Sequence, residues 1–442
     1  NVFFMTFCAL SSAKGMDISM KKRIISLVLV GVLTLSILGG CGKKEIPLEE
    51  STTESTDELI AEEGAQLKFR VGGGKLEYGE SVAKAFEEEY GVPVEVEEAG
   101  MDIVNKMTLD GPSGNGADVF MASHDAYLTA KDAGLLLKLN DQIEESVRDD
   151  VNEIAVETVE TDGDLYGVPV TIECYAMLYN KDLVQGEPAE TMEQIIEEAK
   201  LFNNPAENKF WYLSVVTEAY NMFPFLSVDG FKPFGEDGKN NDDPGFKTPE
   251  FLKALERVRN LNELIPVKAD DLKIETITQL EQNFIDGKTA YYFIGPWLIK
   301  TLKEQNTNFG VSTLPTMDGK QMKTMAGVQN AYVSSYSEYP NAAQLFAEYL
   351  VSEEGAEILY EKAYNVTARK NIENINGLKD DDALKVYTEA FDDAVPMPQV
   401  KRISYYWTTM QSVLSAVFDG KITPEEGAKK AQDDFEALVA SE

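Results

Sequence analysis

The sequence predicts an α/β protein of two domains, on three observations. Apolar residues alternate at period two in short runs and recur at helical spacing between those runs, which indicates strands that alternate with helices. The first such group, residues 67–98, has the pattern of a β-α-β unit. The part of the chain expected to be ordered, roughly 375 residues, is also too long for a single hydrophobic core.

The chain carries an export signal near its start. Three basic residues at 21–23 precede an apolar run from 24 to 38. These are the charged and apolar parts of a secretory signal peptide, and the run is shorter than the ~20 residues that span a bilayer. The signal peptide is therefore placed at residues 20–40, and residues 1–19, which fit no part of it, are interpreted as upstream translated sequence.

The signal ends at a cysteine. Residues 38–41, Leu-Gly-Gly-Cys, resemble the lipobox of bacterial lipoproteins, which implies cleavage before Cys41 and a diacylglycerol on its sulfur. The alternatives are an uncleaved anchor or a chance cysteine. After Cys41 the chain is acidic and lacks aromatic residues, so residues 41–65 are predicted to form a disordered stalk.

Composition excludes several function classes. The chain has 76 acidic and 40 basic residues and a formal charge of −36, which argues against nucleic acid as a partner. Cleavage before Cys41 leaves two cysteines in the mature chain, so if Cys41 is lipidated, Cys174 has no partner for a disulfide. A single histidine and few cysteines give no dense metal cluster, and the acidic loop 233–245 does not match a calcium-binding loop. Neither a metal nor a cofactor is predicted.

The first domain continues with a buried strand and a helix. Residues 117–123 predict the strand, and residues 126–139 predict a helix that enters a turn. Residues 163–184 then predict two short strands on either side of Glu173, a polar residue in an otherwise apolar stretch.

The second domain has well-marked helix starts. Thr191 and Gln194 form a capping-box pattern, and Thr248 precedes a proline at the first helical position. One helix is expected to end at Gly287, before a strand at residues 289–294. Residues 326–336 predict a further strand, and the remainder of the chain to residue 442 is predicted to be mostly helical.

Six segments, in this order along the chain, resemble the extracellular solute-binding proteins of sugar ABC importers, and most of all the maltose/maltodextrin-binding branch. They are residues 117–136, 167–184, 217–230, 287–297, 309–319 and 397–407. The resemblance covers residues 66–440. It implies the two-lobed periplasmic-binding-protein fold of type II, with the ligand in a cleft that closes by a hinge motion.

The resemblance also implies how the chain divides between the lobes, which three crossings join. The N-terminal lobe is expected at residues 66–172 plus 330–377, and the C-terminal lobe at 176–325 plus 383–440. The crossings are expected near residues 172–175, 325–329 and 378–382.

A sugar site needs flat aromatic surfaces for the C–H faces of the rings and planar polar groups for the hydroxyls. By resemblance, the stacking platforms are Tyr220, Trp297 and Trp407, and the polar ligand-binding residues are Lys75, Asp125, Glu173, Glu218 and Gln411. From the residues alone, a tryptophan is more often part of a core and an acid more often a solvated surface residue. The single histidine, His124, is interpreted as a structural hydrogen-bonding residue rather than a catalytic one.

The chain departs from the maltodextrin-binding pattern at four positions. Ala122 and Ala126 stand where that branch usually has tryptophan and arginine, Gln411 stands for an arginine, and Gly74 stands for an aspartate. One platform and two strong donors are therefore missing. Either the glucan is held differently, or the ligand is another oligosaccharide.

The expected function is that of a lipid-anchored, monomeric receptor on the outer face of the cytoplasmic membrane. It would bind a maltodextrin-type oligosaccharide and deliver it to the membrane subunits of an ABC permease. The alternatives are the same role for a different oligosaccharide, an exported glycosidase with two carboxylates at the scissile bond, or a binder of another solute. No catalytic residue is predicted.

Overall fold

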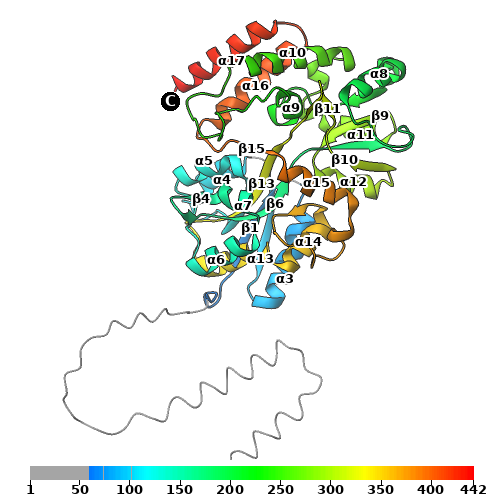
Figure 1. Cartoon of the computed structure of the whole chain (residues 1–442). Coiled ribbons are helices and arrows are strands. Elements are labelled where there is room, and N and C mark those ends of the chain that lie inside the picture. The colour runs from blue at the N-terminus through cyan, green and yellow to red at the C-terminus, as the bar shows by residue number, and fades with distance from the viewer. Residues whose placement is uncertain (1–58, 73, 101) are drawn as a thin grey trace, which may run out of the picture. The chain divides into compact units, whose positions relative to one another are not determined.

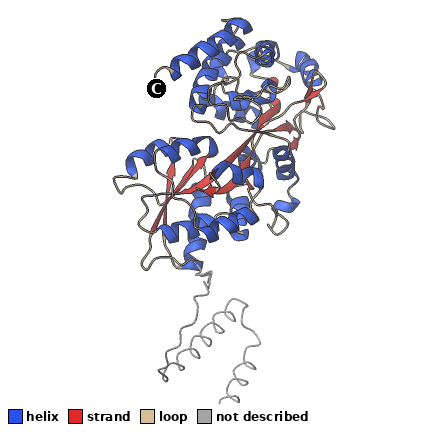
Figure 2. Cartoon of the chain, turned by 60° about the vertical axis from the view of Figure 1, so that its left-hand side comes forward, coloured by secondary structure: helices blue, strands red, loops and turns tan. Residues whose placement is uncertain are grey.

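The computed structural model describes residues 59–72, 74–100 and 102–442 (Figure 1). Within this part of the chain the strands form two main sheets, and Figure 2 shows these strands enclosed by helices. None of the helices in the described part of the chain combines the length and the hydropathy of a membrane span.

The first sheet has the strand order β14-β6-β13-β3-β1-β2, with β15 paired to β13. β1 is parallel to β2 and β3, whereas β13 is antiparallel to β3 and β6. The strands are β1 (Leu67–Gly72), β2 (Val94–Ala99), β3 (Val119–Ser123), β6 (Val168–Glu173), β13 (Met325–Val333), β14 (Val366–Thr367) and β15 (Val395–Pro396). The predicted β-α-β unit is confirmed as β1, α3 and β2.

The helices of this part of the chain pack on the first sheet through apolar side chains. The ring of Phe346 meets those of Phe69 on β1 and Phe86 on α3, each with ring centroids 5.0 Å apart. The helices are α3 (Leu76–Tyr90), α4 (Ile103–Asp110), α5 (Tyr127–Asp132), α6 (Asp141–Asp150), α7 (Glu153–Val156), α13 (Pro340–Tyr349) and α14 (Glu353–Ala363). A small hairpin, β4 (Glu160–Thr161) and β5 (Asp164–Leu165), follows α7.

The second sheet has the order β10-β7-β9-β8. Its central strand β9 is buried along its whole length, and Phe293 packs edge-on against Tyr212 with ring centroids 4.8 Å apart. The strands are β7 (Ala176–Asn180), β8 (Phe210–Leu213), β9 (Thr289–Ile294) and β10 (Phe309–Ser312), with a separate hairpin of β11 (Thr316–Met317) and β12 (Lys320–Gln321). The helices are α8 (Met192–Phe202), α9 (Ala219–Leu226), α10 (Pro249–Leu264), α11 (Ile277–Ile285), α12 (Ile299–Glu304), α16 (Ile403–Phe418) and α17 (Pro424–Val439).

The chain passes from the first sheet to the second after β6 and returns at β13. Cys174 and Tyr175 separate β6 from β7, and the chain returns to the first sheet at Met325, where β13 begins. The third passage between the sheets is spread over a longer segment. Helix α15 (Asp382–Asp392) contacts strands of both sheets, and β15 after it pairs with β13 of the first sheet. Residues 382–396 therefore lie at the junction.

Part of the predicted stalk is ordered. Cys41 and the rest of residues 1–58 lie outside the described residues. Residues 59–65, however, contact the domain: the backbone N–H of Leu59 donates to the Gln142 side chain at 3.0 Å, and Ala65 is buried. The domain thus includes residues 59–65, which precede the predicted boundary at residue 66.

Glu62 explains why this acidic segment is ordered. Its carboxylate accepts hydrogen bonds from the backbone N–H groups of Asn341 and Ala342, at 2.8 and 2.9 Å. These groups lie in the first turn of α13, where backbone donors lack partners within the helix and favour a negative charge. An acid expected to be solvated therefore caps a helix.

An ion-pair network fixes the turn after α9. The side chain of Asp229 is 6% exposed and pairs with Arg257 of α10 and with Lys320. Burial alone would raise the pKa of Asp229, but the hydrogen bonds and charges of these two cations outweigh it and lower the pKa from 3.8 to about 2. The network therefore stabilises the ionised carboxylate.

We expect Asp229→Asn to lower the free energy of unfolding by about 2–4 kcal/mol at pH 7, because it leaves Arg257 without its buried partner. The contribution of a carboxylate with a lowered pKa is complete above its unfolded value near pH 4 and is lost as the pH falls through about 2. Urea titrations at several pH values measure this. Asp318, the exposed partner of Arg257, provides the control: Asp318→Asn should cost less than about 1 kcal/mol. Equal stability of wild type and Asp229→Asn at pH 7 would contradict the prediction.

Candidate functional site

Lys75, Glu173 and Gln329 meet at the first crossing. Glu173 ends β6, and Lys75 immediately precedes α3. The Lys75 ammonium lies 3.7 Å from Glu173 Oε1, and the Gln329 amide of β13 donates to Glu173 Oε2 at 3.1 Å. The Glu173 carboxylate is thus oriented by a cation and an amide. Its remaining lone pairs can accept hydrogen bonds from a ligand.

Three aromatic rings lie beside this group. The Tyr220 hydroxyl, at the start of α9, donates to the backbone carbonyls of Glu173 and Met325 at 3.4 Å. The buried ring of Tyr175 meets Tyr220 and Trp297 edge-on, with ring centroids 5.2 and 5.7 Å apart. Tyr175 therefore packs against both predicted platforms and supports them from the buried side.

Trp297 lies in the short turn that follows β9. A side chain at Gly295 would overlap the Trp297 ring, so this position needs a glycine for the ring to fold back over the turn. The indole remains partly exposed. The Gly-Pro-Trp sequence thus presents an aromatic face at the end of a buried strand.

Asp125 and Trp407 pair across the two halves of the fold. Asp125 follows β3 of the first sheet, whereas Trp407 lies on α16, which packs on α10 and α17 beside the second sheet. The Trp407 indole N–H donates to Asp125 Oδ2 at 3.1 Å, and the buried Tyr406 packs edge-on against the indole. This hydrogen bond links the two lobes directly.

Glu218 and Gln411 form the last pair. Glu218 is the N-cap residue of α9, and the Gln411 amide of α16 donates to its Oε1 at 3.3 Å. Burial raises the pKa of Glu218, and the negative charge of Glu275 adds to the rise. The resemblance would place an arginine at position 411, and a cation there would lower the pKa. The substitution to glutamine leaves this carboxyl without that partner.

The structure brings the eight predicted residues into one connected group. Ser123, whose hydroxyl donates to Asp125, lies opposite Gln329 in the first sheet, and Glu218 lies two residues before Tyr220, so the pairs adjoin one another. Sequence reasoning missed Tyr175 and Gln329. Both lie at predicted crossings, and that position was the available signal for them.

The arrangement suits a neutral ligand rich in hydroxyl groups. Two partly exposed tryptophans and a tyrosine offer flat apolar faces, and three carboxylates with an amide and an ammonium offer hydrogen-bonding partners. Among the described residues, no group of three histidine, cysteine, aspartate or glutamate side chains is arranged to hold a metal ion. The candidate site side chains can bind a ligand by stacking on its apolar faces and by hydrogen bonding to its hydroxyl groups.

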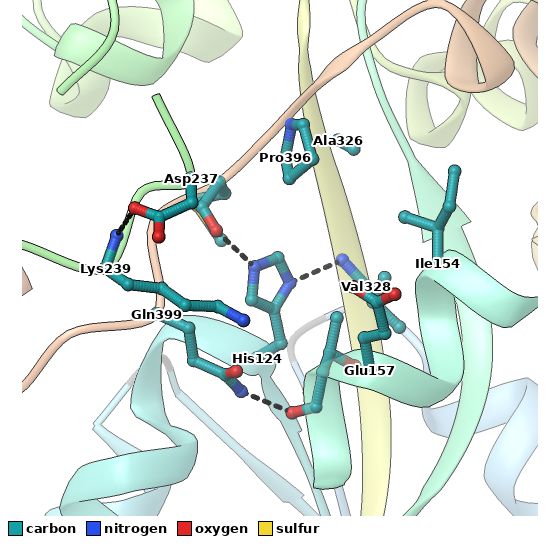
Figure 3. Close-up of a pocket in the computed structure, with 11 residues that line it drawn as sticks. His124, Ile154, Glu157, Asp237, Lys239, Ala326, Val328, Pro396 and Gln399 are labelled. Carbon is teal, nitrogen blue, oxygen red and sulfur yellow. Dashed lines mark hydrogen bonds between the residues drawn. The ribbon is translucent and has the colours of Figure 1, made fainter. Parts of the chain in front are cut away.

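A separate cavity of about 270 Å³ lies on the other face of β13 (Figure 3). Side chains alternate along a strand. Ala326 and Val328 line the cavity, whereas Gln329 faces Glu173, and Gly327 lies against Tyr220. The cavity is thus distinct from the predicted sugar site, although β13 borders both.

Comparisons with known proteins identify the family. The sequence profile named "Bacterial extracellular solute-binding protein" matches residues 81–386, well over half of the chain. A maltooligosaccharide ABC transporter solute-binding lipoprotein of Streptococcus pneumoniae is 28% identical over 427 residues, which cover 95% of this chain and 97% of that protein. A galactooligosaccharide-binding protein of Bacillus subtilis is also 28% identical, over 420 residues that cover 94% and 96%.

Solved structures agree with this result. The crystal structure of MalX from Streptococcus pneumoniae in complex with maltopentaose aligns with a TM-score of 0.75 at 26% identity, and the alignment covers 84% of this chain and all of that one. The predicted two-lobed α/β fold of type II is therefore confirmed. The chain belongs to the family of bacterial extracellular solute-binding proteins.

Proposed function

We propose that this protein is the lipid-anchored binding component of an ABC importer and that it binds a maltodextrin-type oligosaccharide. One observation carries the proposal: Trp297, Trp407 and Tyr220 share one connected site with three carboxylates, and the residues come from both lobes. The relatives whose names state maltooligosaccharide or maltodextrin as the ligand support it.

In this proposal the sugar rings lie on the two tryptophans, and their hydroxyl groups replace contacts that the site now makes with itself. Asp125 and Glu173 each accept a hydrogen bond from a site side chain and have lone pairs left for hydroxyls. Closing the cleft around the ligand would strengthen these bonds by excluding water. Lys75 and Gln411 supply donors.

A second candidate ligand is a galactooligosaccharide. The Bacillus subtilis protein of that name is as similar to this chain as the maltooligosaccharide lipoprotein, at 28% identity. The alanines at 122 and 126 and Gln411 also depart from the maltodextrin pattern. Both candidates keep the same role and differ in the stereochemistry of the hydroxyls.

We propose that the protein binds its sugar without hydrolysing it. A glycosidase needs a carboxylic acid of raised pKa opposite a second carboxylate. Among the predicted site carboxyls, Glu218 has a raised pKa, but Gln411 already donates to it. The matched relatives are named as binding proteins. An assay for released reducing sugar should therefore give no signal above the buffer.

The proposed location is the outer face of the cytoplasmic membrane, with the lipid on Cys41 as anchor. The relative named as a solute-binding lipoprotein and the extracellular description of the family support this. The proposed partners are the membrane subunits of an ABC permease, which a monomeric receptor would meet in its closed form.

The proposal is tested by thermal unfolding of the chain from residue 42 onward with maltose, maltopentaose or a galactooligosaccharide. A true ligand at 100 times its dissociation constant should add about 2.7 kcal/mol of stability. Small-angle scattering with the same sugar should show a smaller radius of gyration. A sugar that raises the melting temperature without contraction would contradict closure, and no response to any oligosaccharide would overturn the proposed ligand class.

A further inference from the structure

His124 lies one residue before Asp125 and is the only histidine in the chain. It starts the 3-10 turn η1 (His124–Ala126) at the end of β3, and its side chain is 2% exposed. Figure 3 shows its ring between β13 and the segment that follows β15. A buried imidazole at this junction joins three stretches that are distant in sequence.

Both ring nitrogens have backbone partners. The N–H of Val328 on β13 donates to Nδ1 at 3.0 Å, so Nδ1 carries no proton. The other nitrogen, Nε2, lies 3.3 Å from the carbonyl oxygen of Met397, which can only accept. Nε2 must therefore carry the proton, and the ring is the neutral Nε2–H tautomer.

His124 and Asp125 are adjacent in the chain but have different partners. The imidazole borders the cavity on one face of β13, whereas the Asp125 carboxylate bonds Trp407 in the predicted sugar site. The two backbone bonds of the imidazole therefore fix the peptide that presents Asp125. In the proposed function Asp125 contacts the sugar, whereas the hydrogen bonds of His124 go to the backbone of Val328 and Met397.

We propose that His124 is a positioning residue, whose neutral Nε2–H tautomer ties β13 and the segment after β15 to the turn that holds Asp125 and so maintains the binding geometry. The inference rests on the proposed function, because it assigns a role in that site. If it holds, the affinity for sugar depends on His124 as well as on the residues that contact the sugar.

The surroundings of the imidazole determine how it responds to acid. Burial lowers the pKa of His124, while the charge of Asp125 and, more weakly, that of Glu173 act to raise it. Three further charged residues line the cavity that the ring borders: Glu157, Asp237 and Lys239. A proton on Nδ1 would remove the acceptor of the Val328 N–H and leave that group unpaired. The tie should therefore be intact above pH 6.5 and be lost as the pH falls through the lowered pKa.

The first part of the test needs no ligand. Because the chain has one histidine, its imidazole ¹⁵N signals are unambiguous. At pH 7.5 they should show a protonated Nε2 and an unprotonated Nδ1. Hydrogen exchange at the Val328 amide should be slow in wild type and at least tenfold faster in His124→Ala, with the Ala331 amide of the same strand as reference. His124→Asn, which keeps an acceptor near Nδ1, should restore protection.

The second part measures sugar affinity between pH 5 and 8. We expect His124→Ala to weaken binding about tenfold at pH 7.5, because it removes two buried hydrogen bonds. His124→Asn and His124→Gln, which keep the acceptor and the donor respectively, should lose less. Wild-type affinity should fall in acid, and both amide variants should show a smaller fall, since they cannot take up the proton.

Glu281 provides the control for the pH profile. Burial raises its pKa to about 7, so its titration could imitate that of a histidine. Glu281→Gln should keep the acid-dependent fall of wild type. If the His124 variants retain the wild-type pH profile and affinity, or if the tautomer is Nδ1–H, the positioning role is overturned. If wild type binds no oligosaccharide, the proposed function fails, while the tautomer and the exchange data still test the tie.

Discussion

Trp297→Ala and Trp407→Ala should each weaken sugar binding roughly 5- to 150-fold, equivalent to about 1–3 kcal/mol of buried aromatic contact. Both indoles are partly exposed, and each packs edge-on against one buried tyrosine, Tyr175 or Tyr406. Truncation therefore removes a surface for the ligand and little of the core. The free energy of unfolding without ligand should fall by less than about 1.5 kcal/mol. Calorimetric titration and urea unfolding measure the two quantities.

Trp211 is the matched control, because it is the one tryptophan of the chain that is not assigned to the predicted site. It packs between Phe202 and Tyr291, and its indole N–H donates to Glu198 at 2.8 Å, away from the connected site. Trp211→Ala should cost about 2 kcal/mol or more of stability and leave affinity unchanged. If Trp297→Ala or Trp407→Ala instead collapses stability with normal residual affinity, that tryptophan is structural.

Cys41→Ser should release the protein from the membrane or leave its signal peptide uncleaved, because a serine offers no sulfur for the diacylglycerol. Two acyl chains give stable anchoring, whereas no other feature of the export signal would retain the cleaved chain. Fractionation of cells that carry the variant, with immunoblotting of membrane and medium, measures the effect. Nearly all of the wild type should be in the membrane fraction.

Cys174→Ser is the control for Cys41→Ser. Cys174 is buried, and its thiol donates to the carbonyl of Tyr387 at 3.2 Å, so that it is inaccessible to lipid transfer. This variant should stay in the membrane fraction with a normally processed N-terminus. Full membrane retention of Cys41→Ser after normal processing would show that another feature anchors the protein.

The sequence predicts the elements whose local signals agree with their tertiary surroundings. The strands predicted at 163–184 and 289–294 are β6, β7 and β9, because continuous apolar runs of that length suit buried strands. Thr248 caps α10 as expected, with its hydroxyl accepting from the Phe251 N–H at 3.2 Å. The β-α-β unit depends on contacts within about 30 residues, which a sequence pattern can report.

Two predicted elements differ from the structure, the first through a side chain four residues away and the second through a distant strand. The capping box at Thr191 is half formed: its hydroxyl accepts from the Gln194 N–H, but the Gln194 amide donates to Glu198. The helix predicted over 126–139 is shorter, since α5 ends at Asp132. Beyond it Leu136 forms a bridge with Ser334, near the end of β13. A strand almost 200 residues away cannot be read from local spacing.

The sequence motifs name candidate site residues, but they do not give the contacts between them. The motifs give Asp125 and Trp407, but their hydrogen bond needs the relative position of the lobes. Tyr175 was missed because an apolar strand stretch conceals a supporting ring. Ala122 illustrates the converse: it is 6% exposed within β3, opposite Asn330, so Ala122→Trp would overpack the sheet rather than restore a platform.

The cap that Glu62 places on α13 has a mechanical consequence. The described chain enters the domain beside the helices of the first sheet, and this carboxylate fastens it there. If Cys41 bears the lipid, the first lobe is the one attached to the membrane. Hinge closure then moves the second lobe toward the first. Tension along the tether would then act on the Glu62 contacts rather than on the hinge, so the bound sugar is shielded from pulling at the membrane.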